Sequence, residues 1–133
     1  MSYVFDSSAI FKTIKEENLD HLVGNYTIGL ARYELGNILW KERTLHRKLS
    51  SDELKRLTRL IREVLGVMQV LGINSHEEDI LDTAEKLKIT FYDAAYVFYA
   101  KEKNLPLVTE DEKIIDKTRT YIKSIRTQDL RTR

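Results

Sequence analysis

Short apolar runs alternate along the chain with longer segments whose apolar residues recur every three or four positions. Residues 3–5 (Tyr-Val-Phe) and 26–28 (Tyr-Thr-Ile) are brief β-branched and aromatic runs bounded by polar residues, a pattern that predicts buried strands. The segment after the first run places Ile10, Phe11 and Ile14 on one helical face. The N-terminal part of the chain therefore predicts a strand, a helix and a second strand.

Helical spacing dominates the middle of the chain. It predicts one helix over about residues 30–48 and a second helix that starts at a capping box formed by Ser50 and Glu53. Residues 70–73 are apolar, and we interpret them either as a strand or as the end of this second helix. The face of the second helix opposite its apolar stripe is basic and carries Lys55, Arg56, Arg59 and Arg62.

The C-terminal half repeats the alternation. Helices are expected over residues 77–87, about 91–103 and about 111–119. Strands are expected at residues 105–109 and 121–125. Strands that alternate with helices favour an α/β fold. We expect three layers, α/β/α, around a mainly parallel central sheet of about four to five strands.

Composition limits the class of protein. A chain of 133 residues with one proline and five glycines leaves no room for a flexible linker, so one domain over residues 1–133 is expected. The lack of cysteine excludes disulfides and zinc–thiolate sites, and three scattered histidines argue against a histidine-rich metal site. The first residues do not form a signal peptide, and no apolar run approaches the roughly 18 residues of a membrane span. We therefore expect a cytoplasmic protein with no membrane partner.

The net charge of +1 does not indicate a uniformly basic nucleic-acid-binding protein. The charge is distributed unevenly, however. Residues 117–133 contain six basic side chains and one acid, and residues 41–62 contain eight basic side chains and three acids. The acids therefore gather elsewhere in the chain.

Two acids stand at the carboxyl ends of predicted strands, where functional groups collect in parallel α/β sheets. Asp6 directly follows the first strand. Asp111 follows the strand that ends at Thr109, with one residue between them. Each acid also has a purely structural explanation. Asp6 is suited to cap the helix that begins near Ser8, and Asp111 is suited to the first turn of a helix with a capping box of Thr109 and Glu112.

Two further acids lie on predicted helices. Asp93 satisfies a capping box with Thr90, but it also shares a helical stripe with Val97 and so points partly toward the core. Glu34 lies within or beside an apolar stripe and has no basic residue three or four positions away. A purely structural role for Glu34 would need a distant Arg or Lys as its partner.

The four acids together indicate a cation site. Several carboxylates at one place repel one another unless a cation neutralises them, and here neither histidine nor cysteine accompanies them. Such a set of oxygen ligands favours Mg²⁺ or Mn²⁺. Cations held in this way commonly act on phosphate esters.

The order and spacing of the acids resemble the PIN-domain nuclease family. The matching segments are Val-Phe-Asp-Ser-Ser at Asp6, Tyr-Glu-Leu-Gly-Asn at Glu34, Tyr-Asp-Ala-Ala at Asp93 and Leu-Val-Thr-Glu-Asp at Asp111. They extend over nearly the whole chain, from residue 3 to about 126. The length and helix pattern are similar to those of the VapC-type toxins of prokaryotic toxin–antitoxin pairs. Phe91 departs from the family, in which a smaller residue or proline is common at that position.

The resemblance implies a Mg²⁺- or Mn²⁺-dependent endoribonuclease. It implies that Asp6, Glu34, Asp93 and Asp111 form the catalytic, metal-binding cluster. It also implies support for this cluster from the polar side chains of Ser7, Asn37 and Thr109. The implied partners are an RNA substrate, a cognate antitoxin protein and a second copy of the chain in a homodimer.

The basic segments supply candidates for holding the RNA backbone, although a solvated surface is the other explanation for such stretches. The candidates are Lys55, Arg56, Arg59, Arg62, Arg119, Lys123, Arg126, Arg131 and Arg133. Phe98 and Tyr99 belong either to the core or to a dimer face. Trp40 and the seven tyrosines are expected in the core or partly within it.

Two other families also carry acids at strand ends. A phosphoacceptor receiver domain needs an acidic pair near its first strand, and a haloacid-dehalogenase phosphatase needs a second Asp where this chain has Ser8. The sequence disfavours both. A stand-alone RNA-processing nuclease and a non-catalytic binding protein with the same fold both stay open.

Overall fold

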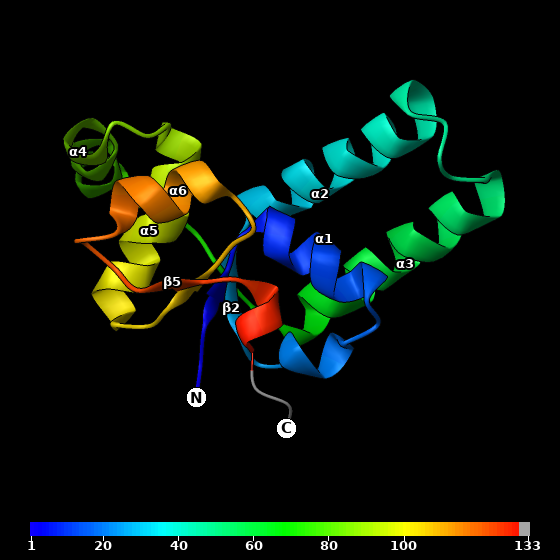
Figure 1. Ribbon diagram of the computed structural model, residues 1–133, viewed down its shortest axis with the longest axis horizontal. Coiled ribbons are helices and arrows are strands. Elements are labelled where there is room, and N and C mark those ends of the chain that lie inside the picture. Colours follow the sequence, from blue (N-terminus) through cyan, green and yellow to red (C-terminus); the bar gives the residue numbers. More distant parts are fainter. Residues whose placement is uncertain (131–133) are drawn as a thin grey trace.

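The computed structural model describes residues 1–130, which form a five-stranded parallel sheet with helices on both faces (Figure 1). The strand order is β3-β2-β1-β4-β5. The predicted three-layer α/β/α fold is therefore confirmed. In chain order the elements are β1 (Val4–Phe5), α1 (Ser7–Lys15), η1 (Leu19–His21), β2 (Tyr26–Ile28), α2 (Leu30–Trp40), η2 (Lys41–Leu45), α3 (Ser51–Val67), β3 (Gln69–Leu71), α4 (Glu77–Leu87), α5 (Phe91–Lys103), β4 (Leu107–Val108), α6 (Glu112–Thr118), β5 (Ser124–Ile125) and η3 (Thr127–Asp129).

The strand order reverses at β1. The strands β2 and β3 lie on one side of β1, and the later strands β4 and β5 lie on the other side. Val4 is therefore paired with Tyr26 on one side and with Leu107 on the other. The carboxyl ends of β1 and β4 lie next to each other at this reversal, which is where parallel α/β sheets bind their ligands.

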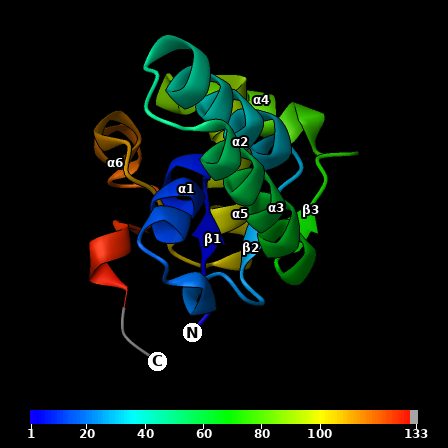
Figure 2. The same cartoon turned by 90° about the vertical axis from the view of Figure 1, so that its right-hand side faces the viewer.

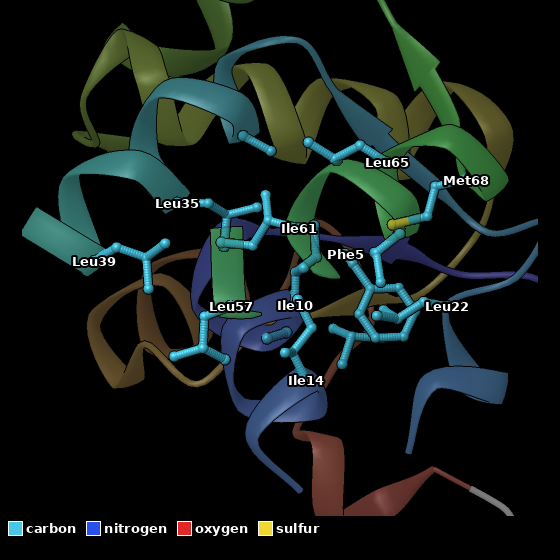
Figure 3. Close-up of a cluster of buried hydrophobic side chains, with 14 residues drawn as sticks. Phe5, Ile10, Ile14, Leu22, Leu35, Leu39, Leu57, Ile61, Leu65 and Met68 are labelled. Atoms are coloured by element: carbon cyan, nitrogen blue, oxygen red, sulfur yellow. The ribbon is translucent and has the colours of Figure 1, made fainter. Parts of the chain in front are cut away.

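The sheet divides the apolar core into two clusters, one on each face, as the central strands β1 and β4 show. Successive strand residues point to opposite faces. Phe5 and Val108 therefore pack with α1, α2 and α3, whereas Val4 and Leu107 pack with α4, α5 and α6. All four side chains are completely buried. Figure 3 shows the first of these clusters, in which Phe5 is surrounded by apolar side chains from the helices on that face.

The helices α2 and α3 project beyond the sheet as a hairpin (Figure 1). Figure 2 shows them crossing beside α1, which covers β1. The helix predicted over residues 30–48 is shorter than expected, because α2 ends at Trp40 and passes into the π-helical turn η2. Arg47, with a φ of 52°, then turns the chain toward α3. The predicted capping box of Ser50 and Glu53 starts α3.

Several predicted boundaries needed correction. The strand expected at residues 121–125 is only Ser124–Ile125, because the backbone N–H groups of Tyr121 and Ile122 donate to the carbonyl of Thr118 in a turn. The strand expected at 105–109 is Leu107–Val108. Of the two interpretations of residues 70–73, the strand is correct, and β3 spans Gln69–Leu71.

Some aromatic side chains also lie elsewhere than expected. Trp40 is 50% exposed, and Tyr33 and Tyr92 are exposed as well, so none of the three belongs to the core. Tyr99 is buried, and its hydroxyl donates a hydrogen bond to the carbonyl of Gly72, so its ring is a core side chain and not part of a dimer face. Among the described helices, none is long and apolar enough to cross a membrane.

The two-sided core predicts a large cost for truncation on the inner face of α2. Leu35 is completely buried, so Leu35→Ala should lower the free energy of unfolding by about 2–5 kcal/mol through lost contacts and a cavity. Leu81 is 59% exposed on α4, so Leu81→Ala should change it by less than about 0.5 kcal/mol. Urea denaturation of both variants checks this, and equal costs would contradict the assigned core.

Candidate active site

The fold brings the four predicted acids to the carboxyl edge of the sheet. Asp6 follows β1, Asp111 follows β4, Glu34 lies in the helix that follows β2, and Asp93 lies in the first turn of α5. Burial raises the pKa of Asp93; a hydrogen bond from Thr90 opposes the shift, while the nearby charges of Asp111 and Glu34 add to it. The charge of Asp93 in turn contributes to raising the pKa of Asp6. The four carboxylates therefore form one electrostatic group.

Asp6 is the most buried of the four, with 5% of its surface exposed. Its Oδ1 atom accepts hydrogen bonds from the N–H of Ala9 at 3.0 Å and from the hydroxyl of Ser8 at 2.7 Å, so it caps α1. Burial raises the pKa of Asp6 from 3.8 to about 6, although hydrogen bonds from Ser8, Thr109 and Ala9 oppose the shift. The predicted capping role is therefore present, and the carboxylate is nevertheless costly to ionise.

Asp111 caps α6 directly. Its Oδ1 atom accepts from the backbone N–H groups of Lys113 at 2.9 Å and Ile114 at 3.3 Å. Its own N–H donates to the hydroxyl of Thr109 at 3.0 Å. The expectation of a capping box between Thr109 and Glu112 was wrong, because the helix begins at Glu112 and Asp111 is its N-cap. The buried Thr109 instead holds the backbone of Asp111 in place.

Glu34 has a partner that the sequence did not reveal. The hydroxyl of Tyr96 donates a hydrogen bond to its Oε1 atom at 2.7 Å. None of the three ion pairs formed within residues 1–130 includes Glu34, so the Arg or Lys partner that a purely structural role requires is missing there. The spacing of residues in α5 does indicate Tyr96 as a neighbour of the acids. It stands one helical turn after Asp93 and so faces the same carboxyl edge of the sheet.

The three predicted supporting residues differ in their surroundings. Thr109 contacts Asp111 as described above. Ser7 lies beside the hydroxyl of Tyr96. Asn37 is exposed, and none of the side-chain hydrogen bonds described for residues 1–130 involves it. Ser8, which sequence reasoning did not select, bridges Asp6 and the backbone N–H of Glu110, the latter at 3.1 Å.

The basic candidates for RNA binding lie in three places. The four on α3 are exposed along that helix. Arg119 and Lys123 precede β5 and so lie at the amino edge of the sheet, away from the acids. Arg126 follows β5 at the carboxyl edge, where it donates to Glu112 at 2.7 Å and to the carbonyl of Glu110 at 3.3 Å. Arg131 and Arg133 lie outside the described residues.

An apolar groove separates α2 from α3. Its volume is about 530 Å³, and three arginines also line it, Arg32, Arg43 and Arg62. The groove lies on the hairpin and does not contain any of the four acids. Its apolar walls are formed by Leu39, Trp40, Leu54, Ile61 and Leu65.

The residues of the acidic group suit a hard divalent cation by type but are not assembled around one. Within residues 1–130, no three His, Asp or Glu side chains lie close enough together to hold a metal ion. Asp6 and Asp111 are instead occupied as helix caps, and Glu34 is held by Tyr96. Their oxygen-only chemistry and mutual repulsion still match the preference of Mg²⁺ and Mn²⁺.

The acidic group thus lies at the strand reversal of a five-stranded parallel sheet. The PIN domain model matches residues 3–119, and the chain belongs to this family. The resemblance to VapC-type PIN nucleases is confirmed by two relatives from Pyrobaculum aerophilum. Exonuclease VapC9 is 31% identical over 124 residues, which cover 92% of this chain and 90% of that protein. Ribonuclease VapC3 is 30% identical over 128 residues, with 88% and 95% covered.

A solved structure agrees with these sequence relatives. The crystal structure of PAE2754 from Pyrobaculum aerophilum superposes with a TM-score of 0.77 at 30% identity. The superposition covers 96% of this chain and 93% of that one. The similarity therefore extends over the whole sheet, including the edge that carries the acids.

The buried Asp6 predicts a stability that depends on pH in the metal-free protein. The folded state binds the proton of Asp6 more tightly than the unfolded state does. Stability is therefore lost as pH rises from 3.8 through about 6, by about 3 kcal/mol in total. Asp6→Asn keeps an oxygen for the cap and has no charge to bury. The variant should be more stable than wild type at pH 7.5, and this advantage should shrink toward pH 4.

Chemical denaturation at several pH values measures the difference between the two proteins. Asp82→Asn, at an exposed position of α4, is the control and should follow wild type throughout. A constant difference between Asp6→Asn and wild type from pH 4 to 8 would contradict the raised pKa.

Proposed function

We propose that this protein is a Mg²⁺- or Mn²⁺-dependent endoribonuclease and the toxin of a VapBC-type toxin–antitoxin pair, acting in the cytoplasm as a homodimer. The observation that carries the proposal is the electrostatic coupling of Asp6, Glu34, Asp93 and Asp111 at one sheet edge. None of these carboxylates forms an ion pair with a basic side chain of residues 1–130. A divalent cation is the counter-charge that such a group lacks.

The proposed ligands are the same four acids, with Ser7, Thr109 and Asn37 as supporting residues. When bound, the cation supplies the Lewis acidity that activates water and stabilises charge on a phosphodiester. The chain itself fixes the positions of the carboxylates. Ser8 and Ala9 orient Asp6, and the first turn of α6 orients Asp111. These contacts hold the acids in place although they repel one another.

Removal of single carboxylates tests the catalytic assignment. Asp6→Asn and Asp93→Asn should each lower the rate of Mn²⁺-dependent RNA cleavage at least about 100-fold, because each removes a charge that holds the cation. Asp82→Asn should cleave like wild type. Circular dichroism establishes that the variants are folded. A folded Asp6→Asn or Asp93→Asn variant with normal activity would show that the site is assigned incorrectly.

The cleavage products test the reaction class in the same assay. Hydrolysis by an activated water does not use the 2′-hydroxyl, so the products should carry 5′-phosphate and 3′-hydroxyl ends. Products ending in 2′,3′-cyclic phosphate would contradict the mechanism. A circular RNA tests the proposed endonuclease activity, because an exonuclease, the activity named for VapC9, does not open it.

The α2–α3 groove supports the proposed antitoxin partner. Its apolar walls and the exposed Trp40 are surfaces that a partner chain would cover, and its three arginines suit acidic side chains. A stand-alone RNA-processing enzyme would instead be purified without an inhibitory partner. A non-catalytic binding protein would show no Mg²⁺ or Mn²⁺ binding in a titration.

The separation of the basic residues predicts which of them contact RNA. Arg62 of α3 lines the same groove as Arg32, which stands two residues before Glu34 in α2, and Arg59 lies one turn before Arg62 on α3. Arg59→Ala combined with Arg62→Ala should weaken RNA binding and reduce the salt slope of log K by about 1.4. Arg119→Ala combined with Lys123→Ala, at the amino edge of the sheet, should reduce the salt slope less. Binding isotherms at several salt concentrations measure both slopes, and an unchanged slope for the α3 pair would refute the contact.

A further inference from the structure

Tyr96 is a buried side chain whose polar end reaches the proposed catalytic group. Only 2% of its surface is exposed, and its ring packs in the core cluster on the α5 face of the sheet. Its hydroxyl donates to Oε1 of Glu34 at 2.7 Å, which joins α5 to α2 across 62 residues of sequence. Burial, the hydrogen bond and charge of Glu34, and the charge of Asp6 raise the pKa of Tyr96 far above its ordinary value. The hydrogen bond to Glu34 is therefore made by a polar atom that is otherwise enclosed in the core.

Core packing alone does not explain this hydroxyl. A phenylalanine fills nearly the same space and leaves no buried polar atom to satisfy. Glu34 in turn would be a partly exposed side chain with three rotatable bonds and no charged partner within residues 1–130. Fixing such a side chain when a cation binds costs conformational free energy. A hydrogen bond already formed in the free protein removes part of that cost.

We propose that Tyr96 is a positioning residue, which holds Glu34 by Oε1 so that Oε2 is presented to the divalent cation. Within the described residues, no hydrogen bond occupies Oε2. Because Asp93 and Tyr96 stand three residues apart on α5, this helix places one carboxylate itself and a second through Tyr96. The inference rests on the proposed function, since it requires that the acids bind a cation.

A second tyrosine on the same helix provides a matched control. Tyr99 is also buried, and its hydroxyl likewise donates one hydrogen bond, to the carbonyl of Gly72, away from the acids. Tyr96→Phe and Tyr99→Phe therefore each remove one hydrogen-bonded hydroxyl from α5. They should have similar effects on the unfolding midpoint, but only Tyr96→Phe should affect the cation.

Calorimetric titration of the proteins with Mn²⁺, in the absence of RNA, gives the decisive measurement. Tyr96→Phe should weaken Mn²⁺ binding by about 10–100-fold, and Tyr99→Phe by less than about twofold. In a Glu34→Ala background, Tyr96→Phe should have no further effect. Wild-type Mn²⁺ affinity in folded Tyr96→Phe would overturn the role of Tyr96 while leaving the proposed nuclease intact. A wild-type protein that binds no Mn²⁺ would overturn both.

A second measurement leaves Tyr96 unchanged, in case Tyr96→Phe does not fold. In metal-free wild type the hydroxyl proton of Tyr96 should exchange slowly enough with water to give its own NMR resonance, because it is buried and hydrogen-bonded. Glu34→Ala should abolish that resonance. A resonance that persists unchanged in Glu34→Ala would show that the hydroxyl does not depend on Glu34 and would overturn the inference.

Discussion

The structure depends on placing a carboxylate where it is costly to ionise. Asp6 is almost fully buried at the point where the strand order reverses, and the nearby charge of Asp93 adds to the cost of ionising it. Backbone N–H groups and hydroxyls satisfy these carboxylates, but no basic side chain of residues 1–130 neutralises them. The two apolar clusters on either side of the sheet must supply the stability that this arrangement consumes.

The capping and functional roles of the acids are therefore not alternatives. Asp6 and Asp111 each cap the helix that follows a central strand, and this places each carboxylate at the sheet edge with its orientation fixed. A helix N-terminus also favours negative charge, which offsets part of the repulsion. The same hydrogen bonds that start the helices thus pre-organise the acidic group.

Much of this fold can be predicted from the sequence. The order of strands and helices follows from hydrophobic spacing, and the capping box of Ser50 starts its helix as predicted. Short-range patterns do not report which edge of the sheet a loop occupies. Arg119 and Arg126 were therefore predicted together as RNA-binding residues. In the structure they lie at opposite edges of the sheet, because β5 runs between them. Tyr96, the partner of Glu34, is not predicted by local sequence patterns, because it is neutral and lies 62 residues away along the chain. Charge considerations alone predict a Lys or Arg partner.

The short outer strands limit how this protein associates with other chains. The edge strand β3 has three residues and β5 has two, so each offers only a short length of backbone to an added strand. The sheet is thereby protected from strand-mediated aggregation. The larger surfaces offered to a protein partner are those of the helices, such as the α2–α3 groove. Changes in surface side chains can therefore alter partner preference without altering the central sheet or its acids.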